Sequence, residues 1–368
     1  MQKFKRVVVK VGTKVITSKD RSLDLNKISD LVSQISSAMD KGVEIILVTS
    51  GAIGAGMSML GLKKRPSDLS YLQATAAIGQ GHLMHLYSGY FRAKGYNIGQ
   101  ILLTQEDFND RNRFLNIKHT INTLLRHKAI PVINENDTVA TDEIKCGDND
   151  RLSSLVADLT GADSLVLLSD VDGLLDESGR VIRFVGDIDH KIMKLGRNKS
   201  HCDLGTGGMV TKLEAARIAA KAGIACIIAN GREKDIIKKI LGDESPGTVF
   251  GITKGSGGDD NARKRWIAYS SRSKGKIFID EGAESAIRKS NKSLLASGVT
   301  AVSGRFNAGD TVSVVNKDGR DIAKGISAYS SEDMKKIKGL KTREFCRVLG
   351  RQAIDSDEAI HKDNLAVL

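Results

Sequence analysis

The chain has 368 residues, 40% of them hydrophobic and 27% charged. This length allows two domains with a sizeable core, and the composition does not suggest a membrane protein. The formal net charge of +12 fits nucleic acid, anionic substrates or simple solubility, and does not choose between them.

Two apolar stretches resemble targeting or membrane segments but fall short of them. At the N-terminus, Lys10 interrupts the apolar run at residues 7–9 before it reaches the length of a signal peptide. Residues 45–62 carry no charge, but they include hydroxyl side chains and four glycines, which predicts a buried strand followed by a glycine-rich loop. The four cysteines are scattered without a C-x-x-C pair, as is typical of reduced thiols. We expect a cytoplasmic protein with no membrane partner.

Short apolar runs rich in β-branched residues recur along the chain. They lie at residues 7–9, 45–48, 101–103, 131–133, 165–168 and 226–228. Between several of them, apolar residues repeat with the 3.6-residue period of a helix, as at Leu25, Ile28, Leu31, Val32, Ile35 and Met39. Strands that alternate with helices predict an α/β fold, with a mostly parallel open sheet and helices on both faces.

Polar segments follow several of these predicted strands. They lie at residues 49–51, 134–137 and 169–170. Because ligands of open α/β sheets bind outside the carboxyl ends of the strands, we expect these loops to converge on one crevice.

Lys10 lies at the end of the first predicted strand, within residues 7–12, where a buried charge is costly without an anion to meet it. Lysines that converge on a phosphoryl group are expected tools of phosphoryl transfer. A solvated strand end is the alternative for Lys10. Ser50, after the second run, is suited to donate to an anionic oxygen, or alternatively to cap the following helix.

Residues 134–138 and 147–150 form the densest polar segments of the chain. Their carboxylates and amides suit a zwitterionic ligand, a Mg²⁺ ion or the orientation of nearby lysines. Turns on the surface are the alternative. We favour recognition of a substrate.

Residues 205–212, with the sequence Gly-Thr-Gly-Gly-Met-Val-Thr-Lys, lead into an amphipathic helix. The glycines let backbone N–H groups close around phosphate oxygens, and Lys212 arrives at the helix start, where an anion is favoured. The spacing fits neither common nucleotide motif, since Val210 takes the place of the third glycine of G-x-G-x-x-G. The segment predicts a phosphate cradle, with a helix-capping loop as the alternative.

The pattern changes after about residue 250. We predict a catalytic domain at 1–253, a linker at 254–273 and a small β-rich domain at 274–368. Strand-like runs and turn-like segments alternate in the last part, at residues 276–280, 299–302, 307–310, 311–315 and 316–319.

Five motifs occur in the order seen in the glutamate 5-kinase family of the amino acid kinase superfamily. They are residues 9–13, 48–53, 134–137, 147–150 and 205–212. The chain resembles this family over nearly its whole length, and its C-terminal part resembles a PUA domain. The resemblance implies ATP-dependent phosphorylation of the γ-carboxylate of L-glutamate to L-glutamyl 5-phosphate, the first step of proline biosynthesis. A carboxylate nucleophile is ionised at neutral pH and needs no general base.

The resemblance also implies roles for individual residues. Lys10 and Lys212 would neutralise the transferred phosphoryl group, and Asp150 would hold both ammonium groups. Glutamate-binding positions are matched by Ser50, Asp137 and Asn149, with Asn134 and Asp148 nearby. Those that match ATP-binding positions are Lys10, Ser169, Asp170, Thr206, Gly207, Gly208, Met209, Val210, Thr211 and Lys212. Mg²⁺ would bridge the phosphates, with no protein ligand assigned.

The family further implies feedback inhibition by proline, a homodimer or homotetramer, and a next-step reductase as a partner. Another carboxylate or carbamate kinase of the superfamily is the first alternative. An RNA-binding protein is the second, through the PUA-like part. The basic run at residues 335–343 lacks interleaved aromatic residues, and residues 294–298 lack the proline expected before the glycine, so RNA binding is disfavoured.

Overall fold

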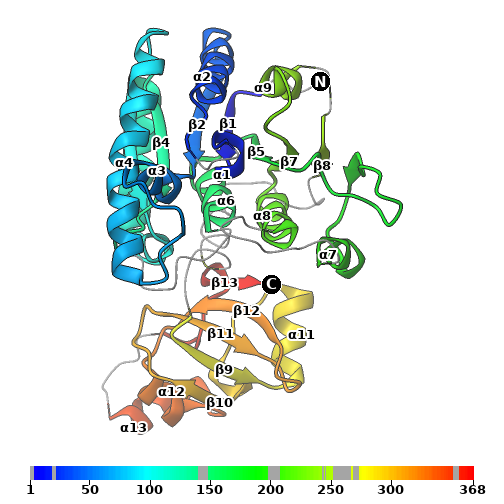
Figure 1. The fold of residues 1–368 in the computed structure, drawn as a ribbon. Coiled ribbons are helices and arrows are strands. Elements are labelled where there is room, and N and C mark those ends of the chain that lie inside the picture. Colours follow the sequence, from blue (N-terminus) through cyan, green and yellow to red (C-terminus); the bar gives the residue numbers. More distant parts are fainter. Residues whose placement is uncertain are drawn as a thin grey trace. The chain divides into compact units, whose positions relative to one another are not determined.

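The computed structural model describes residues 4–18, 22–139, 148–197, 208–242, 244, 246–251, 267, 273–350 and 356–368. The chain forms two compact units (Figure 1). The first comprises Met1–Asp107 and Asn112–Gly257, and the second Phe108–Arg111 and Gly258–Leu368. Most of the linker predicted at 254–273 lies outside the described residues, so the boundaries at 253 and 273 stay predictions.

The first unit contains an eight-stranded sheet in the order β3-β4-β2-β1-β5-β7-β8-β6. Every pairing is parallel except that of β7 with β8, so the predicted mostly parallel sheet is confirmed. All six strand runs predicted for this part lie inside strands. The strands are β1 (Arg6–Val11), β2 (Glu44–Thr49), β3 (Ile98–Leu103), β4 (Ile130–Glu135), β5 (Ser164–Ser169), β6 (Phe184–Val185), β7 (Ala225–Asn230) and β8 (Thr248–Phe250).

Helices cover both faces of this sheet. The helices of the unit are α1 (Thr13–Ile16), α2 (Leu25–Asp40), α3 (Ala52–Met59), α4 (Leu69–Arg92), α5 (Arg111–Arg126), α6 (Asp148–Thr160), α7 (His190–Arg197), α8 (Met209–Lys221) and α9 (Ile236–Leu241). Val7, Val9 and Val11 of β1 pack in one core with side chains of α2, α4 and α9. Because side chains of a strand alternate, Lys10 points to the other face, where α6 and α8 lie. Among the described residues, no helix is long and apolar enough to cross a membrane.

The prediction of a glycine-rich loop after β2 is wrong, because residues 52–59 form helix α3. Gly51 caps this helix with a φ of 102°, which lets the chain turn directly from the strand into the helix. A Cβ atom at Gly56 would lie 1.9 Å from the carbonyl oxygen of Thr75, and one at Gly79 would lie 1.8 Å from that of Ala52. The glycines therefore allow α3 and α4 to pack backbone against backbone.

The second unit has its own sheet, in the order β10-β9-β11-β12-β13, and its own hydrophobic core. The three strand-like runs predicted here correspond to β9, β10 and β11, whereas β12 and β13 were not predicted. The elements are β9 (Gly275–Ile279), α11 (Glu281–Ser290), β10 (Val299–Gly304), β11 (Thr311–Val315), β12 (Asp321–Ile326), α12 (Ser331–Ile337), α13 (Phe345–Leu349) and β13 (Leu365–Val367). The predicted small β-rich C-terminal domain is confirmed.

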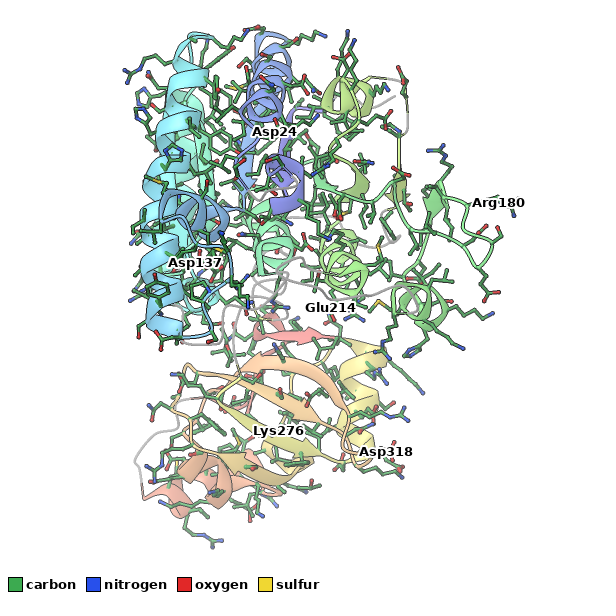
Figure 2. All side chains as sticks on the ribbon, in the orientation of Figure 1. Asp24, Asp137, Arg180, Glu214, Lys276 and Asp318 are labelled. Atoms are coloured by element: carbon green, nitrogen blue, oxygen red, sulfur yellow. The ribbon has the colours of Figure 1, made fainter. Side chains whose placement is uncertain are left out.

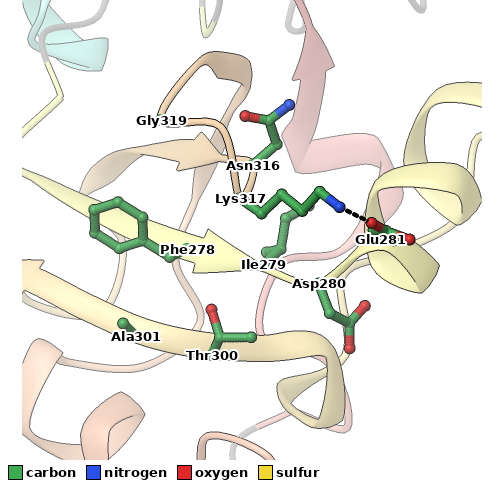
Figure 3. Close-up of a pocket in the computed structure, with 9 residues that line it drawn as sticks. All are labelled: Phe278, Ile279, Asp280, Glu281, Thr300, Ala301, Asn316, Lys317 and Gly319. Carbon is green, nitrogen blue, oxygen red and sulfur yellow. Dashed lines mark hydrogen bonds and ion pairs between the residues drawn. The ribbon is translucent and has the colours of Figure 1, made fainter.

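A pocket of ≈ 450 Å³ lies on the second unit (Figure 3). The side chain of Phe278 lines it, and Lys317 forms an ion pair with Glu281 beside it. Its charged lining residues are Lys317, Asp280 and Glu281, so the carboxylates outnumber the ammonium group. This charge balance makes the pocket itself a poor site for an anionic phosphate.

Candidate active site

Three charged side chains meet at the centre of the first unit. Lys10 comes from β1, Asp150 from the first turn of α6 and Lys212 from the first turn of α8. The Nζ atom of Lys10 lies 2.6 Å from Oδ1 of Asp150, and that of Lys212 lies 3.2 Å from Oδ2. The side chains of Lys10, Asp150 and Lys212 are 7%, 0% and 5% exposed. The structure thus brings together three residues that lie far apart in the sequence.

Burial and the neighbouring charges shift the pKa values of this cluster. Burial alone would raise the pKa of Asp150, but Lys10 and Lys212 outweigh it and hold that pKa below its usual range. Burial lowers the pKa of Lys212, and the nearby Asp150 only partly offsets this effect. With Asp150 ionised and both lysines protonated, the three groups carry one net positive charge. A buried excess of positive charge favours an anion as ligand.

The start of α8 contributes a further contact. The Thr211 hydroxyl lies 2.9 Å from Oδ2 of Asp150 and 2.9 Å from the Gly208 carbonyl oxygen. Gly208 is the N-cap of the helix, while Met209 and Val210 lie in its first turn and are half-buried. The first three residues of the predicted cradle, Gly205, Thr206 and Gly207, lie outside the described residues. The glycine segment therefore does cap a helix, and its predicted role as a phosphate cradle stays a prediction.

A chain of amide hydrogen bonds lies at the ends of β2 and β4 and the start of α6. Nδ2 of Asn149 donates to Oγ of Ser50 and to Oδ1 of Asn134, both at 3.0 Å. Nδ2 of Asn134 in turn donates to Oε1 of Gln80, at 2.8 Å. Oδ1 of Asn134 also accepts from the backbone N–H of Glu135, at 2.9 Å. Three of the predicted substrate residues are thus bonded to one another.

The polarity of this chain follows from one backbone donor. A backbone N–H can only donate, so Glu135 fixes which end of the Asn134 amide is its oxygen. Asn149 must then present its nitrogen to Asn134 and Ser50, which leaves the Ser50 hydroxyl proton available to donate. Oδ1 of Asn149 is buried without a hydrogen-bond partner among the described residues. The site offers one donor and one acceptor side by side, as a zwitterionic ligand requires.

Two other predicted substrate residues, Asp137 and Asp148, lie on the loop after β4 and at the start of α6. Asp137, labelled in Figure 2, is half-buried on the loop that follows β4. Asp148 begins α6, but its side chain is not among those that the structure describes. The capping alternative for Ser50 is wrong, because Gly51 caps α3 and Ser50 instead accepts a hydrogen bond from Asn149.

Ser169 and Asp170 lie at the end of β5, the neighbour of β1. The Ser169 hydroxyl donates to Oδ1 of Asp170 at 3.1 Å, and Nζ of Lys14 lies 3.1 Å from Oδ2. Burial would raise the pKa of Asp170, but Lys14 outweighs it and the pKa is lowered. Lys14 and Gln80 were not predicted as site residues. Lys14 is adjacent to a predicted motif, but for Gln80 the sequence carries no local signal, since its contact depends on how α4 packs.

The residues that the structure describes assign no protein ligand to a Mg²⁺ ion. Among the residues described, no group of three or more His, Cys, Asp or Glu side chains could hold a metal ion. The fully buried carboxylate of the cluster, Asp150, is already paired with two ammonium groups. The arrangement can neutralise an anionic group.

Two buried lysines held by one carboxylate, at the carboxyl ends of parallel strands, can stabilise a phosphoryl group in transfer. Residues 5–230 match the amino acid kinase family, and residues 275–349 match the PUA domain. The first unit is therefore an amino acid kinase domain. The UMP kinase from Bacillus anthracis aligns over 68% of this chain and 97% of its own, with a TM-score of 0.47 and 15% identity.

Curated relatives are much closer in sequence. The chain is 46% identical to the glutamate 5-kinase of Caldanaerobacter subterraneus subsp. tengcongensis, over 99% of this chain and 98% of that protein. It is 43% identical to the glutamate 5-kinases of Moorella thermoacetica (100% and 97% covered) and Gloeobacter violaceus (98% and 99% covered). The chain belongs to the glutamate 5-kinase family.

Proposed function

We propose that this kinase transfers the γ-phosphoryl group of ATP to the γ-carboxylate of L-glutamate, giving L-glutamyl 5-phosphate and ADP as the first step of proline biosynthesis in the cytoplasm. The observation that carries the proposal is the buried cluster of Lys10, Asp150 and Lys212 in a chain of the glutamate 5-kinase family. A carboxylate oxygen attacks the γ-phosphorus, and the bond from phosphorus to the bridging oxygen of ADP breaks. No proton moves, because the nucleophile is already ionised at neutral pH.

Lys10 and Lys212 neutralise the charge on the phosphoryl group as it passes between the two oxygens. Asp150 holds both ammonium groups beside its carboxylate. It also separates them, because Lys10 contacts Oδ1 and Lys212 contacts Oδ2. Phosphoryl transfer depends mainly on such positioning and charge stabilisation. Asp150 is therefore a positioning residue, and the two lysines are the catalytic residues.

The zwitterionic substrate binds at the amide chain. The Ser50 hydroxyl donates to a carboxylate of glutamate, while Oδ1 of Asn149 accepts from its ammonium group. Support comes from the polarity that Glu135 imposes on Asn134 and Asn149. Asp137 and Asp148 are further proposed glutamate-binding residues, on the family resemblance alone.

ATP binds along Ser169, Asp170 and the segment from Thr206 to Lys212. Support comes from the position of Ser169 and Asp170 at the end of β5, and of Met209 to Lys212 in the first turn of α8. Helix N-termini favour anions. Mg²⁺ would bridge the ATP phosphates, with no protein ligand assigned.

Further proposals follow from the family. They are inhibition by proline, assembly into a homodimer or homotetramer, and delivery of the labile acyl phosphate to a reductase. RNA binding by the second unit has little support, because its basic run at residues 335–343 lacks interleaved aromatic residues.

The test is a panel of phosphoryl acceptors. ADP formation is measured with glutamate, aspartate, N-acetylglutamate, carbamate and UMP in turn, with Lys212→Ala as the inactive control. Glutamate is expected to give the highest kcat/KM, and hydroxylamine is expected to trap its acyl phosphate. Preference for another acceptor would replace glutamate with that substrate.

A further inference from the structure

Gln80 is a buried polar residue in the middle of α4, with 9% of its surface exposed. It directly follows Gly79, where the absence of a Cβ atom lets α4 approach the carbonyl oxygen of Ala52 in α3. Because α3 begins directly after Ser50 and Gly51, this close packing brings Gln80 to the loops at the strand ends. None of the proposed catalytic, substrate or ATP contacts involves Gln80.

The side chain of Gln80 contacts the amide chain of the site. Its Oε1 accepts a hydrogen bond of 2.8 Å from Nδ2 of Asn134. Since the backbone N–H of Glu135 holds Oδ1 of Asn134, only Nδ2 is left to face Gln80. Gln80 and Glu135 therefore hold the Asn134 amide from both ends, in the orientation that presents its oxygen to Asn149.

A comparison with Gln34, a buried glutamine of α2, separates this arrangement from ordinary packing. Gln34 uses both ends of its amide, because Nε2 donates to Asp30 and Oε1 accepts from the backbone N–H of Ile237. Gln80 has no hydrogen-bond partner for its buried Nε2 among the described residues. A buried unpaired donor is costly, and a purely structural residue would avoid it. The hydrogen bond that the structure gives to the Gln80 side chain is the one to the site.

We infer that Gln80 is a positioning residue for the acceptor substrate. Its carbonyl oxygen fixes the amide of Asn134, Asn134 fixes that of Asn149, and Asn149 directs its own oxygen and the Ser50 hydroxyl towards glutamate. The inference rests on the proposed function, in which this amide chain binds glutamate. Gln80 sets the affinity for the phosphoryl acceptor and leaves the ATP side of the site unchanged.

The first experiment compares Gln80→Met with the matched control Gln34→Met in the full-length enzyme. Gln80→Met removes the acceptor and leaves Nδ2 of Asn134 unpaired, so KM for glutamate is expected to rise about tenfold while KM for ATP stays unchanged. Gln34→Met is expected to lower the melting temperature without changing KM for glutamate. An unchanged KM for glutamate in folded Gln80→Met, or equal rises in both KM values, would overturn the inference.

The second experiment is a double-mutant cycle with Asn134→Ala. Once Asn134 is gone, Gln80→Met should raise KM for glutamate no further, whereas full additivity would show that Gln80 acts by another route. Gln80→Glu keeps an oxygen facing Asn134 and is expected to raise KM less than Asn134→Ala does. The comparison of Gln80→Glu with Asn134→Ala can be made even if Gln80→Met does not fold. An equal rise of KM for glutamate in these two variants would contradict the inference. An unmodified enzyme without glutamate-dependent ADP formation would instead overturn the proposed function itself.

Discussion

Asp150 is the residue on which the charged cluster depends. It is fully buried, yet its pKa is lowered because two ammonium groups lie within 3.2 Å of its oxygens. A buried carboxylate between two lysines would be a poor choice for stability alone, since the cluster keeps an excess positive charge in the interior. That excess is useful only when an anion arrives, and we infer that the anion is the phosphoryl group.

Lys212 gives the first prediction at this scale. Burial lowers its pKa, so it loses its proton at a lower pH than an ordinary lysine, whose pKa is 10.5. The rate is therefore expected to fall on the alkaline side at a pH below 10.5. In Lys212→Arg the guanidinium stays protonated, so a lower overall rate should be accompanied by a shift of this limb to higher pH. The measurement is kcat against pH at saturating ATP and glutamate.

Lys221 provides the matched control, because it lies on the same helix and burial lowers its pKa as well. Lys221→Arg is expected to leave the alkaline limb where it is. A limb that does not move in Lys212→Arg, or that moves equally in both variants, would assign the titration to another group.

At the scale of elements, the crossing of α3 and α4 determines where Ser50 and Gln80 lie. Gly79→Ala would place a Cβ atom 1.8 Å from the carbonyl oxygen of Ala52. The helices must then move apart, at a cost of about 3 kcal/mol, which corresponds to a fall of roughly 6–12 °C in the melting temperature of a domain of this size. Because Gln80 moves with α4, KM for glutamate should rise as well.

Gly81→Ala is the control for this substitution. Nothing lies within 4 Å of a Cβ atom there, and the residue is exposed in the same helix. Alanine should stabilise the helix by up to about 1 kcal/mol relative to glycine. Calorimetry of both variants checks the pair, and equal melting temperatures would show that the close packing of α3 and α4 is not required.

These elements also show where prediction from the sequence succeeds. Six of the eight strands of the first unit are predictable because a run of β-branched residues is a local signal. Helix α3 is not predictable from the sequence, because glycine has a low helix propensity. Glycine is required at position 56 because the backbone of α4 packs against it, and the sequence around Gly56 does not show this contact. The two-residue strand β6 and the reversed strand β8 depend on pairing with other strands and carry almost no local pattern.

Some residues of the candidate site are likewise predictable from the sequence, and others are not. Lys10 is predictable because a charge inside a strand is conspicuous, and Lys212 because it ends a glycine-rich segment. The bond between Gln80 and Asn134 joins two elements whose contact follows from the packing of α4. Amide partners have no spacing rule, so sequence patterns find the charged residues of a site more readily than the neutral residues that orient them.

At the scale of the whole molecule, the candidate site residues are distributed unequally between the two units. Every candidate site residue that the structure describes lies in the first unit, and each unit has its own sheet and core. We therefore expect a chain that ends at Gly257 to fold and to keep glutamate-dependent ADP formation within about tenfold of the full chain, since the first unit has a sheet and a core of its own. Lys212→Ala in the shortened chain is the inactive control. Cooperative thermal unfolding together with loss of activity would show that the second unit contributes to catalysis.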